Sequence, residues 1–127
     1  MTLTLARGAE AYYQTHVQSR SPLELVVMLY DGALRFLEQS AEAMDRGDMP
    51  AKAVALSRAF AILAELQNTL NVGDGGEVAR QLDALYAHMH DRLTDANVQR
   101  SSVPIRDVIT LLRPLRDAWS QLATAAA

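Results

Sequence analysis

The stretch of sequence that decides the fold is Ser21-Pro22-Leu23-Glu24-Leu25-Val26-Val27-Met28-Leu29-Tyr30-Asp31-Gly32-Ala33. Its first four residues form a capping box, in which the Ser21 hydroxyl accepts a hydrogen bond from the third helical amide and Glu24 reaches back. Pro22 occupies the first helical position, where its missing N–H has no consequence. A long helix therefore begins here, and it carries more apolar residues than one core-facing stripe needs.

The same kind of punctuation divides the rest of the chain into three further helices. Asp48 is a second N-cap, with Pro50 in the turn that follows it. Residues 72–76 (Val-Gly-Asp-Gly-Gly) interrupt the helical pattern and are expected to form the longest loop. The predicted helices run from the Ser21 cap to about Arg46, from the Asp48 cap to about Asn71, from about Glu77 to Asn97, and from residues 101–104 to about Leu122.

Each predicted helix carries apolar residues at alternating spacings of three and four, which places them on one face. Four such faces joined by short connections predict an all-α fold, an antiparallel up-down four-helix bundle over residues 21–124. Residues 1–20 lie outside this framework and are expected to form an extended or short helical lid segment. The four stripes are Leu23, Val26, Tyr30, Ala33, Leu37, Ala41 and Met44; Leu56, Ala59, Leu63, Leu66 and Leu70; Val78, Leu82, Leu85, Met89, Leu93 and Ala96; and Ile105, Val108, Leu112, Leu115, Trp119 and Leu122.

Length and composition limit the classes of function. With 127 residues, no cysteine and a formal net charge of -3, the chain fits one globular domain without disulfide bonds or thiolate metal sites. The charge gives no electrostatic reason to bind nucleic acid, and no apolar run approaches the ~18 residues that span a bilayer. No secretory signal opens the chain, so a cytoplasmic location without direct membrane insertion is expected.

Several apolar residues lie off the core-facing stripes, among them Leu29, Phe60 and Tyr86. The wide buried faces of a compact bundle can account for them, whereas the more specific interpretation is an exposed groove that binds a partner. Gly32 favours a groove slightly, because a glycine inside a helix costs ~1 kcal/mol relative to alanine and is kept where another backbone approaches. The alternative for Gly32 is tight packing against a neighbouring helix of the same chain.

Short motifs in a characteristic order extend over nearly all of the chain between Ala11 and Trp119. They are Tyr12-Tyr13-Gln14, Ser21-Pro22, Leu29-Tyr30-Asp31-Gly32-Ala33, Gly47-Asp48, Gly75-Gly76-Glu77-Val78-Ala79, Leu85-Tyr86 with Met89, Arg92-Leu93, Ala96-Asn97 and Asp117-Ala118-Trp119. No single motif is diagnostic, but together they make the chain resemble the flagellar secretion chaperone family FliS.

The resemblance implies a cytoplasmic export chaperone that binds the disordered C-terminal segment of flagellin. Such a protein prevents premature polymerisation and assists delivery to the flagellar type III export gate, where it contacts the cytoplasmic domain of a membrane protein. The resemblance also implies that the chain is not an enzyme and uses no cofactor. A homodimer is an open alternative, because a second copy can fill an apolar groove.

The groove interpretation leads to a set of candidate contact residues. Asn68 and Asn97 are expected at the rim, where they can pair with the backbone of an extended guest, although Asn97 is also a natural helix terminator. Residues Tyr12-Tyr13-Gln14 are expected to cover the groove as a lid and, once displaced, to contact the export gate. The expected flagellin-binding residues are Leu29, Gly32, Phe60, Leu66, Asn68, Tyr86, Leu93 and Asn97.

The rival interpretation is a helical-bundle signalling module that transfers phosphate through His88. Histidine phosphotransfer domains carry a Lys-Gly pair just after the histidine, whereas here Met89-His90-Asp91-Arg92 follows. A di-metal bundle would need Glu-x-x-His motifs, and none occurs in the sequence. Neither metal ligands nor a catalytic constellation is therefore expected.

Pro114 departs from the pattern of the family because it lies inside the fourth predicted helix. A proline there removes the hydrogen bond to the carbonyl of Thr110 and is expected to kink the helix.

Overall fold

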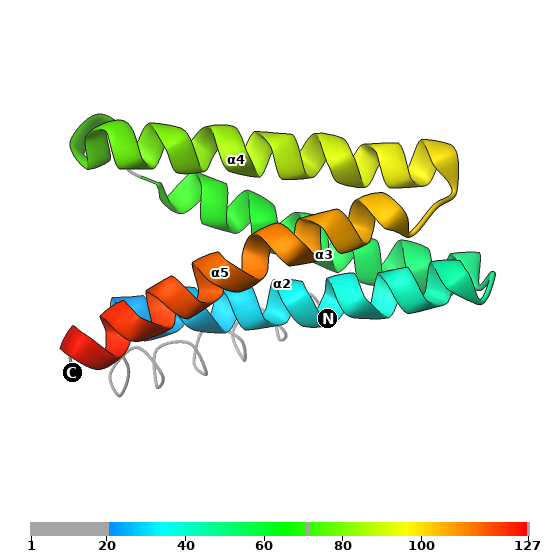
Figure 1. Cartoon of the computed structure of the whole chain (residues 1–127), viewed down its shortest axis with the longest axis horizontal. Helices are drawn as coiled ribbons and strands as arrows, with labels where there is room; N and C mark the ends of the chain where they lie inside the picture. Colours follow the sequence, from blue (N-terminus) through cyan, green and yellow to red (C-terminus); the bar gives the residue numbers. More distant parts are fainter. Residues whose placement is uncertain (1–20, 71, 127) are drawn as a thin grey trace, which may run out of the picture.

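The computed structural model describes residues 21–70 and 72–126, and its regular secondary structure there is entirely helical (Figure 1). The long helices run alternately in opposite directions, which confirms the predicted all-α four-helix bundle. The lid residues Tyr12-Tyr13-Gln14 lie outside the described part of the chain. The helices are α2 (Pro22–Asp45), α3 (Met49–Thr69), α4 (Val72–Gln99) and α5 (Val103–Ala126).

Both predicted N-caps are confirmed. The Ser21 hydroxyl accepts a hydrogen bond from the backbone N–H of Glu24 at 3.2 Å, and the Asp48 carboxylate accepts one from the N–H of Ala51 at 3.1 Å. Between these helices, Gly47 has a φ of 77°, a left-handed conformation that glycine adopts without a steric penalty. The sequence signals therefore set the start of α2 and the tight turn into α3.

The prediction of a long glycine-rich loop is wrong. Helix α3 ends at Thr69 and α4 already begins at Val72, with a kink at Gly76, where φ is 61° and ψ is -138°. A Cβ atom on Gly75 would lie only 2.6 Å from the Cβ of Ala79. The two glycines therefore allow a compact bend at the start of α4.

Two residues assigned to the core stripes are exposed instead: Val78 at 66% and Leu122 at 53%. In both cases the following alanine, Ala79 or Ala123, is buried. At Ala79 the bend at the start of α4 covers the alanine. At the end of α5 the cause is helical drift, because a stripe with a period of 3.5 residues departs from the 3.6-residue turn by ~20° per heptad.

Helix α2 is central to the bundle. It packs closely along both α3 and α5, whereas α4 packs less closely against α5 and α3. Small buried side chains such as Ala33 and Ala59 permit the close approach of α2 and α3, and larger ones such as Met89 fill the space beneath α4. The side of the bundle that carries α4 is therefore held mainly by long side chains.

Tyr30 on α2 and Tyr86 on α4 join these two helices through the core. Their hydroxyls share a hydrogen bond, and the side chains are 0% and 3% exposed. Burial raises the pKa of both phenols because it disfavours the charged form, and at Tyr30 hydrogen bonds to Tyr86 and Trp119 oppose this rise in pKa. The neutral hydroxyl pair satisfies two polar groups that would otherwise be costly to bury.

Helix α5 continues through Pro114 as one helix from Val103 to Ala126. Pro114 is exposed, so water can bind the carbonyl of Thr110 that the proline leaves without a helical partner. None of the helices in the described ranges is long and apolar enough to cross a membrane.

Candidate functional site

One exposed stripe of α3 carries small, uncharged side chains, and Arg58 and Glu65 are exposed beside it. Five exposed residues follow one another at intervals of three or four positions, so they share one side of the helix. Because these side chains are short, the backbone of a bound segment can approach α3 closely. The five residues are Ala53, Ser57, Ala61, Ala64 and Asn68.

A hollow of about 220 Å³ lies between α3 and α4, and we call it the α3–α4 groove. The half-buried Phe60 meets the ring of His90 edge-on, with 4.9 Å between the ring centroids and 62° between the planes. The Lys52 ammonium donates a hydrogen bond of 2.8 Å to the Asn97 side-chain oxygen across the groove. The lining residues are Lys52, Ala53, Leu56, Ser57, Phe60 and Asn97.

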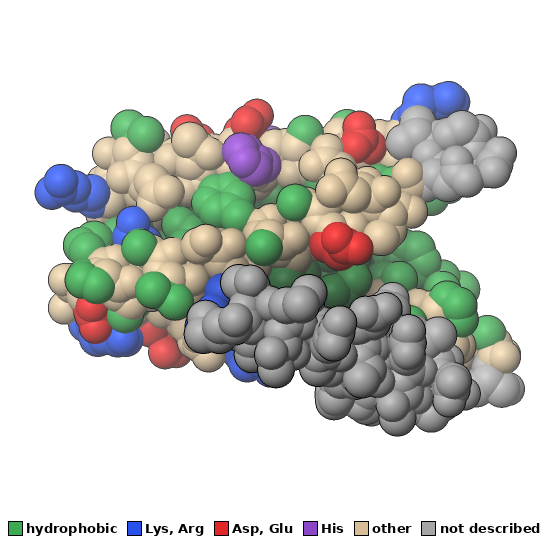
Figure 2. Space-filling view, turned by 180° about the vertical axis from the view of Figure 1, so that it is seen from behind, with side chains coloured by type: hydrophobic (Ala, Val, Ile, Leu, Met, Phe, Trp, Pro, Cys, Tyr) green, Lys and Arg blue, Asp and Glu red, His purple; other side chains and the backbone are tan. Residues whose placement is uncertain are grey.

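Two of the predicted contact residues, Phe60 and Asn97, thus come together in one groove although they are far apart in the sequence. Figure 2 shows the face of the molecule opposite to that of Figure 1, where green hydrophobic side chains lie among tan surface, with a histidine and a few charged side chains between them. A third predicted residue, Asn68, is exposed on α3 itself. An apolar patch flanked by amide and hydroxyl groups is typical of a peptide-binding surface.

A second hollow, of about 300 Å³, lies between the first turns of α2 and the last turns of α3. Leu29 lines it together with Leu25 and Val26, and all three side chains are half-buried. One turn further along α2, a Cβ on Gly32 would lie 3.2 Å from the Cδ1 of Ile62. The nearest atom to this position therefore belongs to α3 of the same chain.

Leu66, Tyr86 and Leu93 are buried in the core. In this conformation they offer no surface to a guest and instead support α3 and α4 from below. Their predicted contact with flagellin stays a prediction. Sequence reasoning also missed Lys52 and Ser57 in the α3–α4 groove, although the recurrence of small residues along α3 was a signal that could have indicated them.

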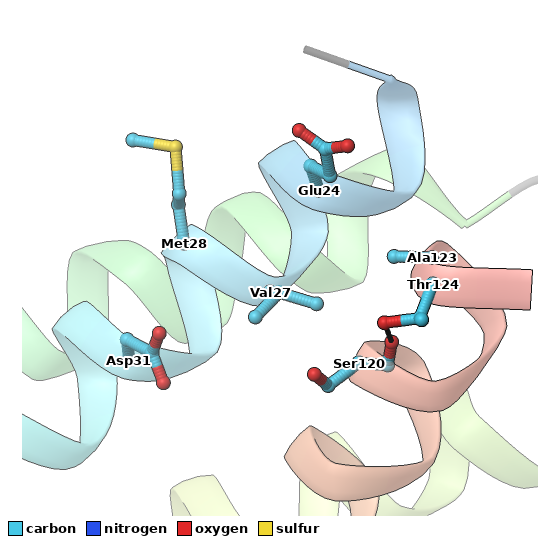
Figure 3. Close-up of a pocket in the computed structure, with 7 residues that line it drawn as sticks. All are labelled: Glu24, Val27, Met28, Asp31, Ser120, Ala123 and Thr124. Carbon is cyan, nitrogen blue, oxygen red and sulfur yellow. Dashed lines mark hydrogen bonds between the residues drawn. The ribbon is translucent and has the colours of Figure 1, made fainter. Parts of the chain in front are cut away.

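A further hollow, of about 360 Å³, opens between the start of α2 and the end of α5 (Figure 3). Glu24 and Asp31 on α2 and the hydroxyl-bearing residues Ser120 and Thr124 on α5 line it, and Val27 lies between the two helices. The Thr124 hydroxyl donates its hydrogen bond to the backbone carbonyl of Ser120. No predicted contact residue lines this hollow.

The line of contact between α2 and α5, which we call the α2–α5 seam, is closed by three ion pairs along its length. The Asp45 carboxylate also accepts a hydrogen bond of 2.5 Å from the Ser102 hydroxyl. This bond, followed by the ion pair with Arg106, lowers the pKa of Asp45. The three pairs are Asp31 with Arg116 at 2.8 Å, Glu38 with Arg113, and Asp45 with Arg106 at 2.6 Å.

The described residues also bear on two other kinds of site, a metal site and a phosphotransfer site. Within the described ranges, no group of three or more His, Asp and Glu side chains is placed to hold a metal ion. His88 is exposed on α4, and no observation favours a phosphotransfer role for it. The surfaces that remain are suited to binding a polypeptide.

Comparisons with known proteins agree with this conclusion. The model of the family described as "Flagellar protein FliS" matches residues 5–126. A "Flagellar secretion chaperone FliS" of Salmonella typhimurium is 37% identical over 126 residues, covering 95% of this chain and 93% of the relative. The proteins of the same name in Vibrio cholerae and Bacillus subtilis are each 36% identical, over 121 and 111 residues, covering 91% and 87% of this chain and 89% and 82% of the relatives.

Proposed function

Because the chain belongs to the FliS family and is a flagellar export chaperone and not an enzyme, we propose that its client is the disordered C-terminal segment of flagellin. The proposal includes a cytoplasmic complex that prevents premature polymerisation and is then delivered to the flagellar type III export gate. The resemblance in sequence motifs supports this client, and the row of small, uncharged side chains on α3 supports an extended or helical guest.

The observation that carries the proposal is the half-buried Phe60 in the α3–α4 groove, next to a row of small, uncharged side chains on α3. An apolar side chain of the guest would cover the Phe60 ring, and the guest backbone would follow the small side chains of α3. Asn68 and Asn97 would bind the guest backbone at the rim and set its register. Leu29 would contact the guest where it passes the hollow between α2 and α3.

Energetic magnitudes favour an apolar interface over an ionic one. Ordering a disordered segment costs several kcal/mol, which burial of ~1,000–3,000 Å² of surface can offset. Each Å² of apolar area contributes ~25 cal/mol, whereas an exposed ion pair contributes only ~0–1 kcal/mol. The affinity for flagellin would therefore depend on Phe60 and its apolar neighbours more than on the arginines.

We further propose that residues 1–20 cover the groove until flagellin displaces them, with Tyr12, Tyr13 and Gln14 then contacting the export gate. This part of the proposal rests on the residue types and the family resemblance, since these residues lie outside the described part of the structure. Deletion of residues 1–18 should leave flagellin binding unchanged or stronger and should weaken binding to the gate. Loss of flagellin binding by a folded truncated protein would place these residues in the guest site.

Isothermal titration of the full chain with a synthetic C-terminal flagellin segment tests the client. We expect a one-to-one complex and a clearly negative change in heat capacity, because apolar surface is buried. A null titration with folded protein would overturn the proposal. Phosphorylation of His88 by a small phosphodonor under the same conditions would support the signalling alternative. Sedimentation of the free protein would show whether a second copy competes for the groove.

A further inference from the structure

Two arginines on the α2–α3 side of the bundle differ from the other arginines of the described chain. The guanidinium carbons of Arg35 and Arg58 lie 5.1 and 5.5 Å from the ring centroid of Phe36. Neither forms an ion pair with a carboxylate of the described residues. Most other described arginines do: Arg46 with Asp48, Arg80 with Glu77, Arg92 with Asp95 and Asp107, Arg106 with Asp45, Arg113 with Glu38, and Arg116 with Asp31 and Asp117.

One guanidinium would suffice to cover the Phe36 ring. Two lie against it, although the chain as a whole has a net charge of -3. Stacking on the ring restrains each guanidinium, so fewer rotamers are lost when an anion binds. The fixed fork of N–H groups of each arginine fits a carboxylate with two hydrogen bonds. We call Arg35, Phe36 and Arg58 the arginine platform.

The platform borders a hollow of about 460 Å³ between α2 and α3, which Arg58 itself lines. Val54 lies in this hollow and is 53% exposed, and Ala51 and Ala55 contribute further small apolar surface. Gln39, Glu42 and Arg46 complete the lining, and Glu42 is the one carboxylate in it. The surface thus combines cationic groups at one edge with an apolar floor large enough for an aliphatic side chain.

We propose that the arginine platform and the adjoining hollow bind an acidic peptide segment of a partner protein. Carboxylates of the segment bind the guanidinium groups of Arg35 and Arg58, and an apolar side chain packs on Val54. Charge complementarity identifies this occupant, because a neutral apolar segment would leave both cations without a carboxylate partner. The site is separate from the α3–α4 groove and does not depend on which client the groove binds.

The probe is a fluorescein-labelled helical peptide of glutamate, leucine and alanine, compared with the same peptide carrying glutamine in place of glutamate. We expect the full chain to bind the glutamate peptide and not the glutamine peptide in anisotropy titrations, with an affinity that falls as salt is added. Equal binding of the two peptides, or no binding of either, would overturn the proposal.

Three variants locate the site. The double variants Arg35→Glu/Arg58→Glu and Arg35→Lys/Arg58→Lys should both lose at least ~10-fold in affinity, since lysine keeps the charge but not the planar fork. The control is Arg100→Glu, at another exposed arginine without a carboxylate partner among the described residues, and it should change the affinity less than ~2-fold. If the Arg35→Lys/Arg58→Lys variant bound the peptide with the wild-type affinity, the guanidinium groups would not bind its carboxylates as proposed, and the proposal would be overturned.

Two further measurements separate this proposal from the others. The flagellin segment should bind the double variants as it binds the wild type, and a parallel loss would assign the platform to the client groove. Failure of the wild type to bind flagellin would count against the proposed client and leave the peptide result standing. A wild-type dimer that the Arg35→Glu/Arg58→Glu variant converts to a monomer would identify a second copy as the occupant and overturn the proposal.

Discussion

The α2–α5 seam and the α3–α4 groove are two contacts between antiparallel helices of one bundle, yet they differ in what closes them. The seam brings its helices close together and has three ion pairs that join residues from Asp31 to Asp45 of α2 to the facing arginines of α5. The groove has helices farther apart, one hydrogen bond between Lys52 and Asn97, another between Gln67 and Asp83, and the half-buried Phe60. A guest that enters the groove would have to displace two hydrogen bonds and not a row of three ion pairs.

The largest expected effect on stability comes from Tyr86, the side chain that joins α4 to α2 through the core. Tyr86→Ala removes a buried ring and its hydrogen bond to Tyr30, and it should lower the free energy of unfolding by ~3–5 kcal/mol. Tyr86→Phe keeps the ring and should lower it by only ~1 kcal/mol. Urea unfolding of the three proteins provides the measurement. Equal losses in both variants would mean that the hydroxyl pair, and not packing, holds α4.

Phe60→Ala tests the groove directly. The variant should weaken binding of the flagellin segment by ~2 kcal/mol, about 30-fold, because a central aromatic anchor is lost. The matched control is Leu122→Ala on α5, which removes an exposed apolar side chain outside the groove and should leave the affinity unchanged. Titration calorimetry gives both values, and an unaffected Phe60→Ala complex would move the guest away from the α3–α4 groove.

Gly32→Ala tests whether the contact between α2 and α3 can accommodate one additional methyl group. Alanine gains up to ~1 kcal/mol in helix propensity, and its Cβ would meet only the flexible end of Ile62 at 3.2 Å. We therefore expect a small rise in the free energy of unfolding, measured by urea titration. A loss of stability would show that Ile62 cannot move and that the spacing of α2 and α3 is fixed.

The smallest expected effect concerns the pH dependence of the seam. The pKa of Asp45 lies below its ordinary value of 3.8, first because of the Ser102 hydroxyl, so this residue stabilises the fold above that pH and ceases to do so as pH falls through its folded value. Ser102→Ala should be slightly less stable than the wild type near neutral pH. As the pH falls below 3.8, the urea midpoints of the variant and the wild type should converge. A difference that persists at low pH would show that the Ser102 hydroxyl does not act through the Asp45 carboxylate.

The starts and inner faces of the helices could be predicted because the sequence signals for them are local. The caps at Ser21 and Asp48 act within one turn, and the apolar period identifies the inner face of each helix. The glycine-rich residues 72–76 were the exception. A glycine permits a loop and a tight kink alike, and only contacts such as that of Gly75 with Ala79 decide between them.

The candidate site could be predicted only in part. Periodicity separates the inner from the outer face of a helix but does not say how far apart two helices lie, and this distance decides whether an apolar residue is covered. Tyr86 and Leu93 are therefore buried, while Phe60 is left half-exposed in the groove. The pairing of Phe60 with Asn97 depends on the register of α3 against α4, which only the packed structure contains.

The ion pairs of the α2–α5 seam join parts of the chain that are made at very different times. Asp31 and Arg116 are 85 residues apart, and Asp45 and Arg106 are 61 apart. During synthesis α2 and α3 can already pack together, but the surface of α2 that α5 covers stays open until the last helix has left the ribosome. The apolar surface of α2 is thus open to aggregation until α5 has been made and can pack on it.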